Sequence, residues 1–204
     1  MTELCPTNCS CVKRPLNQSF EVSCPPSTLD SLPYRLPNPN KPPPRKGRFD
    51  LRFSGSNMKY LESRDYFVDT YRLDVSNSRI ETVTDEAWRS LQKTDMVDLS
   101  GNLLSTLPRR IQEENITFSW IALDGNPLSC ECEQRWLLSW LKSLGGSLHQ
   151  PDSVQCHSPD WLKGRSILLL SSDDFCRNPA LERFVDAIKV RRPMMHNCNY
   201  VKLH

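Results

Sequence analysis

Two groups of cysteines flank a repeated apolar pattern in this 204-residue chain, and they constrain its fold more than any other feature. Each group has four members, which are Cys5, Cys9, Cys11 and Cys24 in the first and Cys130, Cys132, Cys156 and Cys176 in the second. Between the groups, LDVSNSRIETV, VDLSGNLLSTLP and IALDGNPL repeat one pattern, with a weaker copy in LRFSGSNMKYL. A stack of repeats cannot bury its own two end faces, so the terminal units must differ from the internal ones. We therefore predict a repeat array with a cysteine-stapled cap at each end.

Each copy of the pattern has a polar residue three positions after the second of two alternating apolar residues. These polar residues are Ser56, Ser78, Asn102 and Asn126, and their spacings of 22, 24 and 24 residues fall within the range of leucine-rich repeats. The apolar pair indicates a short strand, and the Asn-like residue turns the chain and hydrogen-bonds the backbone of neighbouring coils. The sequence therefore predicts an α/β solenoid, a short leucine-rich repeat horseshoe with a parallel concave β-sheet and two disulfide caps.

The pattern divides the chain into five segments. We expect a cysteine cap over 4–37, a Pro-rich basic loop over 38–48, about four repeats over 49–126, a second cysteine cap over 127–176 and a tail over 177–204. The basic loop is either a solvated insertion or a contact for a polyanion or a partner. The tail is expected to contain a short amphipathic helix, with its apolar stripe at Leu181, Phe184, Val185 and Ile188.

Large apolar residues outside the strands indicate where the core continues. Trp88 and Leu91, and Tyr66 one unit earlier, lie where such repeats place a large side chain under the outer arc. In the second cap, apolar residues recur at helical spacing before Gly145 and Gly146, and we expect this helix to close the open end of the core through Trp136, Leu137, Trp140, Leu141 and Leu144.

Cysteine usage and charge indicate the compartment and exclude some partners. Disulfide caps imply an oxidising environment, so we expect an extracellular or cell-surface location. No stretch approaches the ~20 apolar residues that span a bilayer, and no signal peptide precedes Cys5. We interpret the chain as a trimmed or partial ectodomain, attached to a membrane only through a segment that this chain does not contain. A net charge of +2 does not favour nucleic acid or a membrane surface as the main partner.

Two cysteine-containing segments of the sequence resemble segments of a known protein family. CPTNCSC with Cys24 resembles the amino-terminal flanking cap of extracellular leucine-rich repeat proteins, and NPLSCEC with Cys156 and Cys176 resembles their carboxy-terminal cap. The resemblance covers roughly residues 4–176 and includes Toll-like, Slit-like and Trk-like receptor ectodomains. Spacing alone allows three pairings in each group, whereas the resemblance implies the pairs Cys5–Cys11, Cys9–Cys24, Cys130–Cys156 and Cys132–Cys176. The ninth cysteine, Cys198, is either a free thiol or an intermolecular bridge.

Parallel strands set equivalent residues of neighbouring repeats side by side, about 4.8 Å apart. One outward column is expected to read Asp50, Arg72, Met96, Trp120, and the next Arg52, Asp74, Asp98, Ala122. Opposite charges alternate at the amino-terminal end, whereas Met96 and Trp120 place an apolar patch on a face that should be wet. Either a partner contacts this patch or the second cap covers it, unless the register differs. The candidate ligand-binding residues are Met96, Trp120, Arg72, Asp98 and Asp74.

Enzymatic, metal and cofactor sites are not indicated. The four histidines, His149, His157, His196 and His204, have no serine or cysteine nucleophile motif beside them. Zinc could be imagined at Cys130, Cys132, Cys156 and His157, but Cys-x-Cys followed by lone cysteines favours disulfides. Two triplets predict N-glycosylation, at Asn17 (NQS) and at Asn115 (NIT).

We therefore expect a non-enzymatic extracellular protein-binding module, the ectodomain of a cell-surface receptor or adhesion protein that recognises a protein ligand. The alternative is a secreted matrix or inhibitory leucine-rich repeat protein without a signalling role. A third class, an intracellular repeat scaffold, would require reduced thiols.

Overall fold

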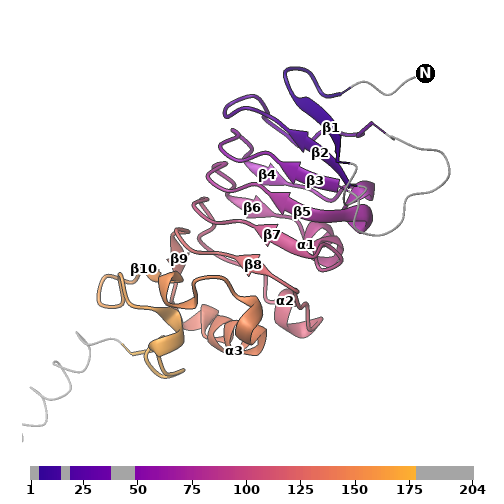
Figure 1. Cartoon of the computed structure of the whole chain (residues 1–204). Coiled ribbons are helices and arrows are strands. Elements are labelled where there is room, and N and C mark those ends of the chain that lie inside the picture. The colour runs from indigo at the N-terminus through magenta and orange to yellow at the C-terminus, as the bar shows by residue number, and fades with distance from the viewer. Residues whose placement is uncertain (1–4, 15–18, 38–48, 178–204) are drawn as a thin grey trace, which may run out of the picture.

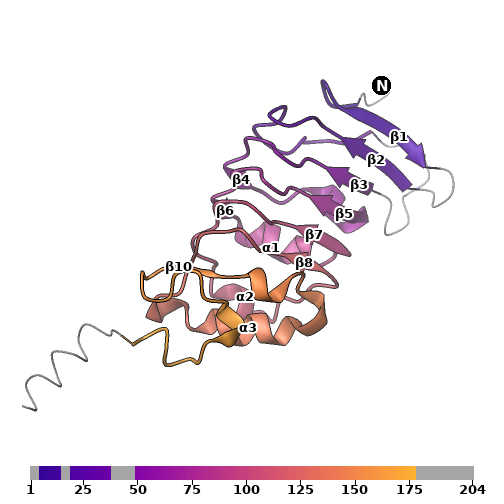
Figure 2. The ribbon, with the colours of Figure 1, turned by 60° about the vertical axis from the view of Figure 1, so that its left-hand side comes forward.

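The computed structural model describes residues 5–14, 19–37 and 49–177, which form a stack of coils with a cap at either end (Figure 1). The basic loop 38–48, Asn17, the expected tail helix and Cys198 lie outside the described residues. Figure 2 shows the strands following one another along the stack, from β1 at one end to β8 beside the second cap.

One six-stranded sheet runs through the stack in the order β1-β2-β3-β5-β7-β8. The first cap forms a β-hairpin, in which β1 (Ser10–Arg14) pairs antiparallel with β2 (Ser19–Ser23). All later pairings are parallel, and each repeat contributes one strand, namely β3 (Phe49–Arg52), β5 (Thr70–Asp74), β7 (Met96–Asp98) and β8 (Ile121–Ala122). The predicted solenoid with a parallel sheet is confirmed, and the hairpin extends that sheet beyond the four expected strands.

The repeat strands are held in register by their inward residues. Leu51 pairs with Leu73, Leu73 with Val97, and Val97 with Ile121, and all four side chains are fully buried. Because side chains alternate across a strand, this register places Asp50, Arg72 and Met96 on the opposite side of the sheet. We call that side the concave face.

The turn after each strand is fixed by the predicted polar residue. The Oδ1 atom of Asn102 accepts hydrogen bonds from the backbone N–H groups of Ser78 (2.9 Å) and Ile80 (3.0 Å). Its Nδ2 donates to the carbonyls of Val75 (3.0 Å) and Leu99 (2.9 Å). Asn102 is 2% exposed, so these bonds satisfy backbone groups that water cannot reach. Adjacent coils are therefore locked together at every turn.

The connections between repeats carry short elements. β4 (Tyr60–Leu61) and β6 (Thr82–Val83) form a second parallel pair, and η1 (Asp65–Asp69), α1 (Asp85–Leu91) and α2 (Arg110–Glu113) return the chain to the next strand. The Thr84 side chain accepts a hydrogen bond from Ala87 N (3.2 Å) and caps α1. Trp88, Leu91 and Tyr66 are buried under this outer arc, as predicted.

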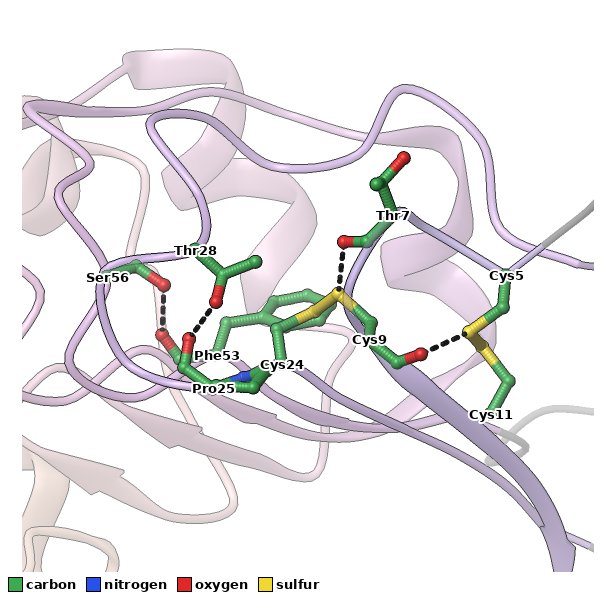
Figure 3. Close-up of a disulfide and its surroundings, with 9 residues drawn as sticks. All are labelled: Cys5, Thr7, Cys9, Cys11, Cys24, Pro25, Thr28, Phe53 and Ser56. Atoms are coloured by element: carbon green, nitrogen blue, oxygen red, sulfur yellow. Dashed lines mark hydrogen bonds between the residues drawn. A yellow bond between two sulfur atoms is a disulfide. The ribbon is translucent and has the colours of Figure 1, made fainter.

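Two disulfides staple the first cap, and Figure 3 shows them beside the first repeat coil. Cys5 is bonded to Cys11, and Cys9 to Cys24. Cys24 is 5% exposed and its backbone N–H donates to Arg52 O (2.9 Å), so the disulfide closes the hairpin at a residue that is hydrogen-bonded to β3.

The second cap closes the other end of the core. Its main helix, α3 (Trp136–Leu144), contains all five predicted apolar residues and ends before Gly145, and Trp140 donates its indole N–H to Ile116 O (2.9 Å). The ring of Trp140 lies edge-on to that of Trp88, with centroids 6.4 Å apart. The cap also contains β9 (Leu128–Ser129), η2 (Cys132–Gln134), η3 (Gly145–Ser147), η4 (Pro151–Ser153), β10 (Cys156–Ser158) and η5 (Ile167–Leu169). Disulfides join Cys130 to Cys156 and Cys132 to Cys176.

Replacing the central asparagine should unfold the stack more readily. Asn102→Ala leaves the backbone groups of Ser78, Ile80 and Val75 buried without these partners, so we expect a loss of about 3 kcal/mol in the free energy of unfolding, measured by urea denaturation. The matched control is Asn57→Ala at an exposed asparagine, which should change stability by less than about 0.5 kcal/mol. Equal losses in both variants would contradict the role of the turn.

The disulfides should differ in their effect because they close loops of different length. The Cys132–Cys176 bond spans 44 residues and the Cys5–Cys11 bond spans 6. Chain-entropy arguments give a stabilisation of about 4 kcal/mol for the Cys132–Cys176 bond and about 2 kcal/mol for the Cys5–Cys11 bond. Replacing each pair by serines and measuring urea unfolding should therefore show the larger loss for the second cap, and the reverse order would contradict the entropic account.

Candidate functional site on the concave face

The structure brings the five predicted ligand-binding residues onto the concave face, on three adjacent strands. Arg72 pairs with Met96 in register, and Asp74 pairs with Asp98. Trp120, one residue before β8, accepts a hydrogen bond at its carbonyl from Val97 N (3.0 Å), which places it beside Met96. All five side chains are partly exposed.

The amino-terminal half of the face is a network of ion pairs. Arg14 and Arg52 both contact Glu21, at 2.7 and 3.4 Å, and Arg52 also pairs with Asp50 at 2.9 Å. The hydrogen bonds that Arg52 donates to Asp50, followed by the Coulomb attraction of nearby carboxylates, raise the pKa of Arg52. Because the arginines are 43–54% exposed, solvent screens these pairs and each adds little to stability.

Met96 and Trp120 continue the same face as an apolar pair. Met96 lies in register with Arg72, so its outward position follows from strand pairing and the alternative of a different register does not hold. The ring of Trp120 packs against His149 of the second cap, with centroids 4.8 Å apart and planes tilted by 37°. Both apolar side chains nonetheless stay partly exposed. The cap therefore covers part of the pair and leaves the rest open to solvent.

The second cap also adds a strand-like segment to the edge of the sheet. Leu148 bridges to Ile121 in parallel, and His149 N donates to Ile121 O (2.8 Å). Ala122, expected on the open face, is 1% exposed beside this segment. Sequence reasoning grouped His149 with unassigned loop histidines, because nothing in its local sequence indicates pairing with a strand 28 residues earlier.

Serine side chains hold two carboxylates of the face in place. Asp74 Oδ1 accepts from Ser76 N (3.1 Å) and Oγ (2.7 Å), and Asp98 Oδ1 accepts from Ser100 N (3.0 Å) and Oγ (2.6 Å). The next repeat has Asp124 in place of the serine. The Oδ1 atom of Asp124 is buried and has no hydrogen-bond partner among the described residues.

The cysteines and histidine once considered for zinc do not fit a metal site. Cys130, Cys132 and Cys156 are each in a disulfide, so they offer no thiolate to a metal ion. Within the described ranges, His, Cys, Asp and Glu side chains form no group of three that could hold a metal ion. No described helix is long and apolar enough to cross a membrane.

Known proteins share this architecture. The chain is 29% identical over 111 residues to trophoblast glycoprotein of Macaca fascicularis, and 27% identical over 104 residues to a phospholipase A2 inhibitor of Gloydius brevicaudus siniticus. These matches cover 53% and 51% of this chain. No protein-family model matches. Among solved structures, Drosophila Toll in its complex with Spatzle aligns with a TM-score of 0.70 at 19% identity, over 85% of this chain and 22% of that chain.

The chain has the fold of capped leucine-rich repeat ectodomains, a parallel-sheet solenoid with two disulfides in each cap. A further relative is chondroadherin of Mus musculus, which is 29% identical over 119 residues and 58% of this chain. This leucine-rich repeat chain spans 26% and 31% of the length of the two relatives above. The four disulfides among the described residues fit an oxidising environment such as the outside of a cell.

Replacing two tryptophans, one buried and one partly exposed, should show which of them belongs to the hydrophobic core. Trp88→Ala removes a ring that is 1% exposed and should cost about 4 kcal/mol of unfolding free energy. Trp120→Ala removes a partly exposed ring and should cost less than about 1.5 kcal/mol. Thermal or urea unfolding measures both, and a loss for Trp120→Ala as large as that for Trp88→Ala would assign Trp120 to the core.

Proposed function

We propose that the chain is a non-enzymatic extracellular protein-binding module, the ectodomain of a cell-surface receptor or adhesion protein, and that it recognises its ligand on the concave face. The observation that carries this proposal is the partly exposed pair Met96 and Trp120 at the end of a face whose other half is ion-paired. An aromatic ring beside a flexible thioether is the composition that protein interfaces favour at their energetic centres.

The rigidity of the sheet supports this choice of surface. Met96 and Trp120 stand on adjacent parallel strands whose inward neighbours, Val97 and Ile121, are fully buried. The disulfide-stapled cap fixes His149 against the Trp120 ring. Side chains held in this way lose little further conformational entropy when a partner binds, so less of the contact energy is offset and the affinity is higher.

The names of the relatives are consistent with protein ligands. One is an inhibitor of phospholipase A2, and another, 32% identical over 72 residues, is the high affinity nerve growth factor receptor of Gallus gallus. The inhibitor also motivates the second candidate, a secreted matrix or inhibitory protein without a signalling role. The two candidate functions predict different locations for the native full-length protein. Detection on intact cells after a high-salt wash favours the receptor, and recovery from the medium favours the secreted form.

The binding surface can be tested with a matched pair of tryptophans. The oxidised chain, displayed as a tetramer, is screened on an array of cells that each express one membrane or secreted protein. For the protein found, Trp120→Ala should weaken binding by about 30-fold, equivalent to about 2 kcal/mol. The control is Trp161→Ala in the second cap, at a ring that is 43% exposed, and it should stay within about twofold. Dependence on Trp161 without dependence on Trp120 would place the site elsewhere.

Asn115 is our proposed glycosylation site. It is exposed in the turn after α2, has a φ of +49°, and begins the triplet Asn115-Ile116-Thr117. In protein secreted from eukaryotic cells, Asn115→Gln and Thr117→Ala should both remove the mass of one glycan, whereas Thr117→Ser should retain it. Intact-protein mass spectrometry before and after enzymatic deglycosylation measures this, with Asn57→Gln as the control outside any sequon.

A further inference from the structure

Charge is distributed unevenly along the concave face. In its amino-terminal half, Glu21 and Asp50 each contact an arginine, and Arg72 reaches Asp74 at 3.6 Å. In its carboxy-terminal half, Asp98 and Asp124 flank the apolar pair. Within residues 5–14, 19–37 and 49–177, no cation forms an ion pair with either of these two carboxylates. This half of the face therefore has negative charge in excess.

The two carboxylates have unused acceptor capacity. Ser100 occupies only Oδ1 of Asp98, through its N–H and its hydroxyl. The Oδ1 atom of Asp124 is buried and receives no hydrogen bond from the described residues. A buried charged acceptor without a donor is costly, and a cation that reached it would recover that energy. A positively charged group bound beside Asp124 would therefore lower this energetic cost.

The register sets Asp98 diagonally across from both Trp120 and Asp124 on the neighbouring coil. Gly101 N donates to Asp124 O (2.8 Å), and Leu99 N donates to Ala122 O (3.0 Å), so Asp98 stands beside Ala122 on the neighbouring strand. Ala122 is flanked on its own strand by Trp120 and Asp124, two positions away on either side. Ala122 itself is 1% exposed beside Leu148 and His149, so the partly exposed groups of this region are Met96, Asp98, Trp120 and Asp124.

This set of groups matches one kind of side chain. Lysine and arginine have an apolar stem that packs on Met96 and an aromatic face, and a cationic end that carboxylates accept. A cation above the face of a tryptophan gains further from the ring quadrupole. An anionic or purely apolar segment would instead leave the Asp98 and Asp124 charges facing a surface that cannot pair them.

Resting on the proposed function, we infer that the ligand docks a positively charged protein segment on the carboxy-terminal half of the concave face. A Lys or Arg of that segment contacts Asp98 and Asp124, while an adjoining apolar side chain packs on Met96 and Trp120. The amino-terminal half, whose charges already pair with one another, adds contact area without a strong charge preference.

The test uses a library of random disulfide-constrained peptides displayed on phage and selected on the oxidised full chain. Peptides retained by the wild-type chain and lost on Trp120→Ala define the concave-face binders. We expect these to be net positive, with Lys or Arg next to an apolar residue. Asp98→Asn and Asp124→Asn should each weaken the best synthetic peptide about tenfold, and raising NaCl from 0.05 to 0.3 M should weaken the wild-type complex more than either variant complex.

Asp160→Asn is the matched control, because it removes the same charge at an exposed site in the second cap. It should leave peptide affinity unchanged. Asp124→Asn also guards against a folding artefact: its Oδ1 makes no hydrogen bond within the described chain, so melting should be unchanged or slightly higher. Asp98→Asn could also weaken binding by disturbing the turn, because the Ser100 hydroxyl donates a hydrogen bond to the Asp98 carboxylate. A loss of affinity in Asp98→Asn therefore supports the inference only if Asp124→Asn shows a loss as well.

The outcomes separate the two proposals. Peptides that depend on Trp120 but are neutral or acidic, or that bind Asp98→Asn and Asp124→Asn as well as wild type, would overturn the charge inference and leave the concave face as the binding surface. If selection yields no peptide that depends on Trp120 or Met96, the concave face itself is wrong and both proposals fail.

Discussion

The structure depends on one constraint: the buried backbone of each turn finds its hydrogen-bond partners in a neighbouring coil. Asn102 bonds the backbone of the preceding coil and of its own, and Asn126 does the same one coil later. Because no coil satisfies these groups alone, stability belongs to the stack rather than to its units. The same bonds fix the position of every strand along the concave face, and hence which side chains meet there.

The end coils lack one neighbour, and the two caps solve this in different ways. At the amino-terminal end, an antiparallel hairpin pairs with β3, and the Cys9–Cys24 disulfide fastens it. At the other end, α3 covers the core with Trp140, while the segment at Leu148 pairs with β8. The second solution has a consequence for recognition, because it sets His149 against Trp120 at the rim of the candidate site.

The concave face combines a stable scaffold with surface chemistry that varies along its length. Parallel sheets are usually buried on both sides, since the connections between their strands place helices on both faces. Here the inward side is fully buried at residues such as Leu73 and Val97, whereas the outward side keeps partly exposed charges. Ion pairs neutralise one half of that surface. The other half retains an apolar pair and two carboxylates, which is the composition of a surface completed by a partner.

Sequence alone determined the repeat register, the apolar residues and the end of α3, and the outward positions of Arg72, Met96 and Asp98, because periodicity of apolar residues dictates which side of a strand is buried. It also indicated that the cysteines form caps, although their pairing came from family resemblance. Tertiary structure decided the rest: the hairpin that extends the sheet, the packing of His149 on Trp120, and the burial of the Asp124 Oδ1 atom without a hydrogen-bond donor among the described residues. These depend on contacts between segments distant in sequence, which no local pattern encodes.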